Sequence, residues 1–579
     1  MEQIEKIRHS LAHIMAQAIL DFWPKTKLGI GPAIENGFYY DMALPAEALG
    51  EGGNEEFLKK IEVRMKELIK ENQKFIGKKV AKITAKRLFK NQPYKLELIK
   101  ELPGKTVGTY QNGNFLDLCK GGHILNTKEI RPNAFKLTKI AGAYWKGSEK
   151  NKMLTRIYGL AFQTEKELQD FIKMQEEAEK RNHRILGQKL DLFIFSDLVG
   201  QGLPLFTPKG TILRDLLDSY VWELRRAKGY EKVDIPHITK KELYETSGHW
   251  DKFKDELFKI NTREGHVFAL KPMNCPHHIQ IFSRKKWSYR ELPQRYASTT
   301  KIYRDEQTGE LFGLSRVRSI TQDDAHVFCK FEDIENEFYN VWDIIDNFYG
   351  TFGFKLKVRL SLRDPKTPEK YHSLPEYWDR AEEMLRNIIK KREIINSEAK
   401  GEAAFYGPKI DFIATDSIGR EWQVGTIQLD FVQPKKFKLY YASDKGEEPV
   451  VIIHTAIMGS IERFLSILIE HYSGAFPVWL SPVQVCVVPI SEKHLEYANK
   501  IKKDLENKNI RAELKNENET LGKKIREAEI QRIPYLLIIG DKEIQAQSVS
   551  VRQRDKGDVG IINLEKFIEK ITEEITKKI

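Results

Sequence analysis

The sequence has few cysteines and no long apolar run. Only four cysteines occur in 579 residues, Cys119, Cys275, Cys329 and Cys486, and they lie too far apart for the disulfide framework of a small secreted domain. No stretch approaches the roughly 18 apolar residues that span a bilayer. Met1 leads directly into a charged helix, which a signal peptide would not do. These absences predict a cytoplasmic protein without a membrane partner.

The common nucleotide-binding loops are missing as well. Gly29 and Gly31 come nearest to a phosphate loop, but no Lys-Ser or Lys-Thr pair follows, and Phe38-Tyr39-Tyr40 resembles a strand. No Walker motif and no dinucleotide fingerprint occurs elsewhere. We therefore expect neither a P-loop NTPase nor a Rossmann dehydrogenase.

Positive charge exceeds negative charge in an otherwise ordinary composition. Apolar residues make up 41% and charged residues 31%, and the net charge is +12. A chain of this length predicts roughly three to five domains. The excess of positive charge favours a polyanionic partner, with nucleic acid the first candidate. A basic surface without a specific partner is the alternative.

Helical patterns occur in the N-terminal part of the chain and in a segment that would connect two domains. Residues 1–23 have apolar residues at three- and four-residue spacing and end before Pro24, and another helix is expected near residues 54–72. A helix from Thr164 to Gly187 begins with a capping box of Thr164 and Glu167. Its many charges predict a connection between domains rather than a core element.

The remainder of the chain favours two different sheets. An amphipathic helix with apolar residues between Leu213 and Leu224 ends at Gly229, and strands predominate from there to about residue 478. Helices do not alternate regularly with these strands, so a mainly antiparallel sheet is expected. Strands and helices alternate in the last hundred residues, which predicts a small α/β domain with a partly parallel sheet.

A charged segment follows the predicted strand at Tyr303. Arg304 and Glu306 are two residues apart, as are Arg316 and Arg318, and glycines lie between the pairs. In an extended hairpin each pair would face one side of the sheet. Guanidinium groups bind phosphate and carboxylate oxygens bidentately, so this face suits a nucleotide. A solvated strand face with ion pairs is the alternative.

Histidines and cysteines form one spaced group near the N-terminus. His9 and His13 are four residues apart on the first helix, and Cys119 and His123 repeat this spacing after Asp117. Such a set could bind zinc or could form a hydrolytic pocket with histidine as base. Partly buried histidines near an unrelated cysteine would give the same pattern.

Further along, local spacing singles out no metal site. Candidate ligands are scattered, and several are equivalent on paper: Cys275, His277, His278, His326, Cys329 and His454.

Taken together, these residues resemble a class II threonyl-tRNA synthetase over nearly the whole chain. The first class II motif corresponds to the helix ending at Gly229 and the segment to Pro236, and the second holds Arg304 and Glu306. Further signatures are Gly248–Asp251, Lys271–Pro276, Thr321–His326, Ala404–Lys409 and, as the third motif, Gly459–Arg463. Long bacterial members begin with a ubiquitin-like domain, and we expect this chain to be a form lacking it.

The resemblance implies an α+β multidomain fold. Its core would be the class II antiparallel sheet with helices, flanked by an N-terminal α+β editing domain and a C-terminal α/β anticodon-binding domain. The expected boundaries are 1–140 for editing, 141–187 for a connecting segment and linker helix, 188–478 for catalysis and 479–579 for anticodon binding.

The resemblance also implies the site residues. Arg304 and Arg463 would be catalytic, and the ATP-binding residues would be Arg304, Glu306, Arg316 and Arg463. The threonine pocket would contain Gln322, Asp324, Tyr406 and Gln428, beside a zinc ion held by Cys275, His326 and His454. The editing site would contain His9, His13, Lys95, Asp117, Cys119 and His123. The anticodon readers would be Asn516, Arg526, Arg532, Glu543 and Arg552.

The implied reaction has two steps. Threonine is activated with ATP to threonyl-adenylate and is then transferred to the 3′ end of tRNA(Thr), with one Zn²⁺ per subunit, Mg²⁺ bound with ATP, and a homodimer expected. Valine lacks the hydroxyl of threonine and would leave a polar site unsatisfied, but serine lacks only a methyl group, worth about 1–3 kcal/mol. The first His/Cys group would therefore hydrolyse mischarged seryl-tRNA(Thr).

Two other functions remain possible at this level. The first is another class II enzyme, specific for proline or serine, against which the set of Cys275, His326 and His454 argues. The second is a non-catalytic RNA-binding paralogue, which would be expected to lose Arg304, Arg463 or a metal ligand.

Overall fold

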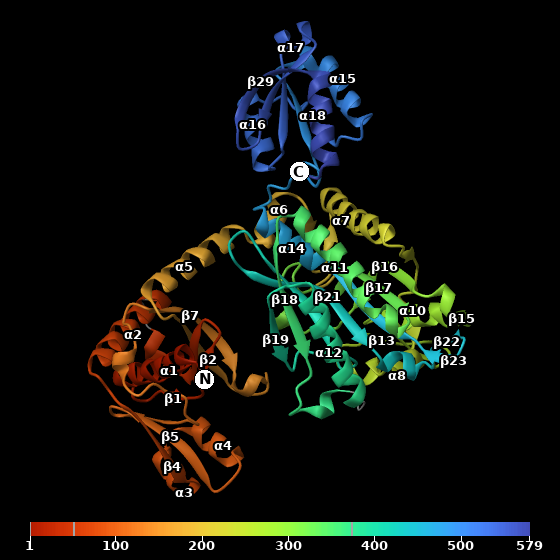
Figure 1. The fold of residues 1–579 in the computed structure, drawn as a ribbon. Helices are drawn as coiled ribbons and strands as arrows, with labels where there is room; N and C mark the ends of the chain where they lie inside the picture. Colours follow the sequence, from red (N-terminus) through yellow and green to blue (C-terminus); the bar gives the residue numbers. More distant parts are fainter. Residues whose placement is uncertain (1, 50–52, 372–374) are drawn as a thin grey trace. The chain divides into compact units, whose positions relative to one another are not determined.

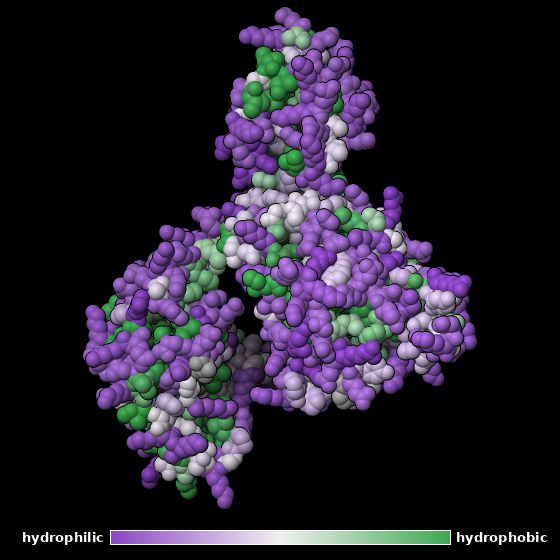
Figure 2. All heavy atoms as spheres, in the orientation of Figure 1, coloured by the Kyte–Doolittle hydropathy of each residue, from purple (hydrophilic) through white to green (hydrophobic). Residues whose placement is uncertain are grey.

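The computed structural model describes residues 2–49, 53–371 and 375–579. The chain forms two compact units, Met1–Glu176 and Glu177–Ile579. Figure 1 shows the elements of each, and Figure 2 shows a mostly hydrophilic face on which apolar side chains form separate patches. In the described residues no helix combines the length and apolarity needed to cross a membrane.

The first unit contains two sheets. Helices α1 (Gln3–Phe22) and α2 (Gly53–Lys70) pack on the sheet of β1 (Lys27–Leu28), β2 (Ala33–Ile34), β3 (Gly37–Ala43), β8 (Met153–Ala161) and β7 (Phe135–Tyr144). Their shared core buries apolar side chains of α1 such as Leu11 and Ile14. A smaller sheet of β4 (Phe75–Ala81), β5 (Thr106–Asn112) and β6 (Phe115–Leu118) carries α3 (Lys82–Leu88) and α4 (Pro93–Glu101).

The predicted helix between Thr164 and Gly187 is two helices, α5 (Glu165–Lys180) and α6 (His183–Lys189). The capping box is confirmed, because Thr164 Oγ1 accepts from the Glu167 N–H and Glu167 accepts from the Thr164 N–H. Asn182 interrupts the helix with an extended ψ of 117° and caps α6 through its side chain. Gly187 does not end a helix; a Cβ there would lie 2.2 Å from the Phe193 ring, so close packing requires glycine.

The second unit is built on an eight-stranded sheet. Its strand order is β11 (Glu231–Lys232), β16 (Gln294–Tyr303), β17 (Ser319–Cys329), β24 (Val451–Ser460), β21 (Glu421–Asp430), β20 (Lys409–Thr415), β18 (Lys355–Leu362) and β19 (Asn396–Lys400). The pairs between β16 and β18 are all antiparallel, and the edge strands β11 and β19 pair in parallel. The mainly antiparallel sheet expected from the sequence is confirmed.

Long helices cover the sheet and complete the main core. They are α7 (Pro208–Ala227), α11 (Ile334–Thr351), α12 (Pro375–Lys391) and α14 (Ile461–His471). The apolar face of α7 is part of this core, with Leu213 and Leu217 fully buried. That face is therefore accounted for within one chain and does not by itself indicate a subunit interface.

The predicted hairpin with charged strand faces is only partly right. β16 and β17 do form an antiparallel hairpin, but β16 ends at Tyr303 and β17 begins at Ser319. Arg304, Glu306 and Arg316 thus lie in the connecting loop, where the Arg304 N–H still donates to the Arg318 carbonyl. Loop geometry, not period-two alternation, sets where these side chains point.

The C-terminal part of the second unit has its own sheet. Its strand order is β26 (Ala512–Leu514), β25 (Val485–Pro489), β27 (Tyr535–Ile539), β28 (Ser548–Gln553) and β29 (Gly557–Asn563). β25 is parallel to both β26 and β27, and the other pairs are antiparallel. Helices α15 (Leu495–Glu506), α16 (Leu521–Ile530), α17 (Asp541–Gln545) and α18 (Leu564–Thr576) complete the partly parallel α/β fold expected.

A buried ion pair joins α7 to the central strands. The Arg225 guanidinium donates to the carbonyls of Asp323 and Asp324 and lies 3.4 Å from Asp323 Oδ2. The same carboxylate oxygen accepts from the backbone N–H groups of Ile457 and Met458 on β24. Both charged side chains are almost completely buried, so each depends on the other for compensation.

We predict that Arg225→Ala lowers the free energy of unfolding of the second unit by about 3–5 kcal/mol, because Asp323 is left as an uncompensated buried charge. Arg226→Ala on the exposed side of the same helix should change it by less than about 0.5 kcal/mol. Urea unfolding followed by tryptophan fluorescence measures both. Equal effects of the two substitutions would contradict a role for the buried pair.

Candidate functional site

One face of the large sheet gathers polar side chains. On β17, alternation points Gln322, Asp324 and His326 to the same side. His326 lies opposite His454 of β24, and His454 in turn lies opposite Gln428 of β21. Antiparallel register thus brings His326 close to two side chains, His454 and Gln428, that are more than a hundred residues away in the sequence.

Cys275 joins this group at the start of α10 (Cys275–Phe282). The ligand atoms of Cys275, His326 and His454 all lie within 4.8 Å of one another, and all three side chains are buried. His326 Nε2 and His454 Nδ1 face each other at 2.9 Å. One thiol sulfur and two imidazole nitrogens are the donor set that zinc prefers, and three ligands leave one position open.

The outer nitrogens of the two histidines are held by further groups. Asp430 Oδ2 lies 2.8 Å from His454 Nε2, so this nitrogen donates the proton and Nδ1 keeps its lone pair for a metal. His278 Nδ1 lies 2.8 Å from His326 Nδ1, and the other His278 nitrogen lies 3.0 Å from Ser298 Oγ. The donor set and its hydrogen-bonded surroundings fit a tetrahedral cation.

Sequence reasoning did not identify Asp430 or assign a role to His278. A signal for Asp430 exists, since it follows Gln428 by two residues and therefore shares its strand face. His278 shows no such signal, because it was one of several equivalent histidines until the fold placed it behind His326.

A polar pocket adjoins the three ligands. The Tyr406 hydroxyl donates to Gln428 Oε1 at 2.6 Å, and its ring stacks on His454 with centroids 4.9 Å apart. Asp324 Oδ1 lies 4.0 Å from His326 Nε2, and burial raises the pKa of Asp324 to about 6. Gln322 is half-buried on the same face of β17. The predicted pocket residues are therefore assembled around the candidate metal ligands.

The predicted phosphate-binding arginines differ in their surroundings. Arg304 stacks over the Phe253 ring at 5.0 Å, and burial lowers the pKa of its guanidinium. Arg463 lies in the first turn of α14, and partial desolvation lowers its pKa as well. Arg316 instead binds Glu306 Oε2 at 2.7 Å and Glu310 Oε2 at 2.9 Å. Glu306 must release Arg316 if both are to contact one nucleotide.

The first unit contains a second cluster. His9 and His13 come from α1, and Cys119 and His123 follow β6. Cys119 Sγ lies 3.5 Å from His9 Nε2 and 3.2 Å from His123 Nε2, and the other nitrogen of His123 lies 3.1 Å from Ser10 Oγ. The four side chains predicted from the two equal spacings are therefore in contact.

A buried carboxylate network lies beside this cluster. Asp117 binds Lys95 Nζ and the Tyr40 hydroxyl, each at 2.5 Å, and Lys95 also donates to that hydroxyl at 2.9 Å. His13 Nε2 lies 3.6 Å from the same carboxylate. Tyr40 was not foreseen as a site residue. Its strand was recognised, but nothing in the sequence shows which strand faces Asp117.

Burial keeps the cluster electrically neutral near pH 7. It lowers the pKa of His9, His13 and His123, the last to about 2, and raises the pKa of the Cys119 thiol to about 11. Neutral imidazoles can accept a proton from water, and the adjacent thiol can donate a hydrogen bond. The strongly lowered pKa values of His13 and His123 make them weak bases, so His9 is the better candidate for general-base hydrolysis. The donor set of the cluster would also accept a metal ion.

The five predicted RNA-reading residues are divided between two ends of the C-terminal sheet. Asn516 follows β26 and Glu543 lies in α17 after β27, near the carboxyl ends of the parallel strands. Arg552 on β28 pairs with Leu536 near the amino end of β27. Arg526 lies on α16, which connects these ends.

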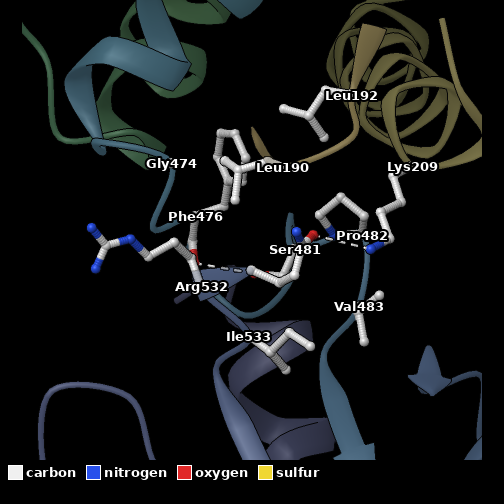
Figure 3. A pocket seen from close by; sticks show the side chains of 11 residues that line it. Leu190, Leu192, Lys209, Gly474, Phe476, Ser481, Pro482, Val483, Arg532 and Ile533 are labelled. Carbon is white, nitrogen blue, oxygen red and sulfur yellow. Dashed lines mark hydrogen bonds between the residues drawn. The ribbon is translucent and has the colours of Figure 1, made fainter. Parts of the chain in front are cut away.

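Arg532 lies where the C-terminal sheet meets the rest of its unit. It lines a small cavity with Leu190, Lys209 and Ile533, and Figure 3 shows its guanidinium extending away from the other side chains. Its φ is 56°, and its carbonyl accepts from Arg554. The structure thus places it apart from Asn516 and Glu543.

Comparisons with known proteins agree with this architecture. Residues 258–472 match the tRNA synthetase class II core domain (G, H, P, S and T), residues 484–574 the anticodon binding domain, and residues 107–158 the threonyl and alanyl tRNA synthetase second additional domain. The matches fall on the large sheet, the C-terminal sheet and the first unit.

Full-length relatives cover the whole chain. The chain is 46% identical to the threonine–tRNA ligase of Thermotoga petrophila, over 100% of this chain and 89% of the relative. It is 48% identical to that of Acetivibrio thermocellus, over 99% and 88%. Among solved structures, the RNA binding domain of threonyl-tRNA synthetase from Cryptosporidium parvum matches with a TM-score of 0.65 and 37% identity, over 68% of this chain and 98% of that one.

We predict that alkylation of Cys119 by iodoacetamide at pH 8 is at least about a hundredfold slower in the metal-free native chain than in urea. The raised pKa of about 11 leaves little thiolate. The native rate should continue to rise above pH 9.5, which separates thiol ionisation from restricted access. Mass spectrometry of the labelled peptide measures both rates. Rapid labelling at pH 7 would instead indicate a thiolate paired with a protonated histidine.

Proposed function

The chain belongs to the threonine–tRNA ligase family, and we propose which of its residues carry out binding, catalysis and editing. The chain is an aminoacyl-tRNA ligase that joins threonine to tRNA with ATP and carries an editing domain, and the family uses Mg²⁺ with ATP. We assign editing to residues 1–140, the connection to 141–187, catalysis to 188–478 and anticodon binding to 479–579.

We propose that Cys275, His326 and His454 hold a zinc ion beside the threonine pocket. The convergence of these ligands with Asp324 on one sheet face supports this assignment most strongly. Bound zinc would supply a Lewis acid that takes the amino group and side-chain hydroxyl of threonine. Asp324 would accept a hydrogen bond from that hydroxyl, and Gln322, Tyr406 and Gln428 would complete the pocket.

Selection of threonine follows from the polarity of this pocket. Valine would enter without a hydroxyl and leave Asp324 without its partner, which is enough for discrimination of about 10⁴–10⁵. Serine keeps the hydroxyl and loses only the contact of one methyl group, worth about 1–3 kcal/mol. A hydrolytic step is therefore needed for serine and not for valine.

Activation of threonine requires positioned cations rather than an enzyme nucleophile. We assign Arg304 to the α-phosphate and the amino-acid carboxylate, Glu306 to the adenine, and Arg316 and Arg463 to the outer phosphates. The partial burial of Arg304 strengthens its interaction with charge that develops on the phosphate, whereas the Arg463 side chain is exposed at the start of α14. Mg²⁺ bound with ATP would share that charge.

Editing is assigned to the cluster of the first unit. We propose that an ester of serine binds beside His9, His13, Cys119 and His123, where a neutral histidine would take the proton of the attacking water. Asp117 and Lys95 would form a charged pair beside this cluster, and the Tyr40 hydroxyl contacts both of them. The substrate of this site would be seryl-tRNA(Thr).

Contacts with the tRNA anticodon are assigned to the C-terminal sheet. The proposed readers remain Asn516, Arg526, Arg532, Glu543 and Arg552. The net charge of +12 favours association with the phosphate backbone.

We also propose that the enzyme is a homodimer. The support is a group of exposed apolar side chains near β9 (Phe193–Ile194) and β10 (Leu205–Phe206), namely Ile194, Phe195, Leu198, Val199 and Leu205. Sedimentation velocity should give about twice the monomer mass at micromolar concentration, and a monomer would contradict the proposal.

ATP–pyrophosphate exchange with threonine, serine and valine tests the catalytic assignment. We expect exchange with threonine, weaker exchange with serine and none with valine. Cys275→Ser should abolish both zinc binding and exchange, and Asp430→Asn should weaken zinc binding about ten- to a hundredfold in a chelator competition assay. Asp444→Asn, an exposed carboxylate, is the control. Full exchange by zinc-free Cys275→Ser would refute the metal assignment.

For the editing site, His9→Ala combined with His13→Ala should slow deacylation of seryl-tRNA(Thr) at least about a hundredfold, because the proton acceptor is lost. Threonine exchange of the same variant should remain normal, because the second unit carries it out. Wild-type deacylation rates in the double variant would place editing elsewhere.

A further inference from the structure

A buried histidine connects α14 to the loop of residues 304–318 between β16 and β17, which we call the nucleotide loop. His183, at the start of α6, is fully buried. The Leu314 N–H in the loop before β17 donates to His183 Nε2 at 3.1 Å. His183 Nδ1 lies 2.7 Å from Glu470 Oε1 on α14. Since Nε2 accepts, the ring proton is on Nδ1 and is donated to Glu470.

Glu470, the hydrogen-bond partner of His183 Nδ1, is also held in place. Glu470 Oε1 accepts a second hydrogen bond from the His183 backbone N–H, and its other oxygen lies 2.6 Å from Arg420 Nη1. Burial opposes ionisation of Glu470, but these partners outweigh it and lower its pKa. The histidine is therefore held in one tautomer and one orientation.

The tip of the loop is shaped to fit His183. Gly313 has a φ of 50°, and a Cβ at this position would lie 2.2 Å from His183 Nε2. Next to it, the Leu314 side chain is buried in the main core, and the Arg184 guanidinium lies over the Phe312 ring at 4.6 Å. Gly313, the buried Leu314 side chain and the contact of Arg184 with Phe312 therefore pack this segment closely against α6.

A second contact joins the loop to the same helix face. Ser315 Oγ lies 2.8 Å from Ser466 Oγ, and Ser466 Oγ donates to the carbonyl of Arg463. Arg463, Ser466 and Glu470 follow helical spacing on α14, so they lie along one side of it. That side carries Arg463, one of the two proposed ligands of the outer phosphates, and the loop carries the other, Arg316.

We propose that His183 is a positioning residue for ATP binding. By holding the Leu314 N–H against α14, it fixes the distance between Arg316 in the loop and Arg463 on the helix. The inference rests on the proposed roles of these two arginines. His183 does not contact the amino-acid pocket, so its loss should weaken the nucleotide site selectively.

Two substitutions separate the two ring nitrogens. In His183→Asn the side-chain amide occupies the place of Nδ1 and nothing replaces Nε2, so the Leu314 N–H loses its acceptor. In His183→Gln the amide reaches the place of Nε2 and can accept from Leu314, while the backbone N–H still binds Glu470. His471→Asn is the matched control, because His471 accepts from the Ser417 N–H and does not contact the loop.

The test is ATP–pyrophosphate exchange with ATP and threonine varied separately. We expect His183→Asn to raise KM for ATP about tenfold, because the loop that carries Arg316 is no longer fixed once the Leu314 N–H has lost its acceptor, with KM for threonine and zinc content nearly unchanged. His183→Gln should restore KM for ATP to within about twofold, and His471→Asn should match wild type.

Three outcomes would overturn the proposal: an unchanged KM for ATP in His183→Asn, equal increases for ATP and threonine, or no rescue by His183→Gln. If His183→Asn does not fold, Ser315→Ala removes the second contact of the loop, and an unchanged KM for ATP in that variant would overturn it. Absence of exchange in the wild-type enzyme would instead refute the proposed nucleotide site.

Discussion

The antiparallel pairing of β17 with β24 and of β24 with β21 is the constraint on which the second unit depends. It sets His454 opposite both His326 and Gln428, and it leaves Asp324 on the same face. A shift by one residue would turn these side chains to the other face of the sheet. Asp323, on the opposite face, accepts from β24 backbone groups and pairs with Arg225, so the register is held from both sides.

The two chemical clusters use burial in opposite ways. In the second unit, the proposed metal ligands His326 and His454 are buried beside groups that hold each ring by its outer nitrogen, which leaves the inner nitrogens available for a metal. In the first unit, burial depresses the histidine pKa values and raises that of Cys119, so that the rings remain neutral bases. The same residue types thus suit two different proposed chemistries because their hydrogen-bond partners differ.

Helix α14 links several parts of the second unit. It packs on β17 and β24, carries Arg463 at its start, and holds the nucleotide loop through Ser466 and, by way of His183, through Glu470. Arg420 extends this network to the turn before β21. The position of the loop is therefore tied to the core of the sheet and not only to its own two strands.

The sequence by itself determined the elements and one of the two clusters. Apolar periodicity predicted α1, α7 and the sheet types, because side-chain spacing reports the faces of helices and strands directly. The equal spacing of His9/His13 and Cys119/His123 marked the first cluster, and family resemblance, not spacing, selected Cys275, His326 and His454. Tertiary structure alone decided what surrounds them. The sequence pattern predicted one continuous helix from Thr164 to Gly187, but Asn182 divides it into α5 and α6. Roles for Asp430, His278, Tyr40 and His183 emerged only where strands and helices distant in sequence come into contact, since local spacing carries no information about such neighbours.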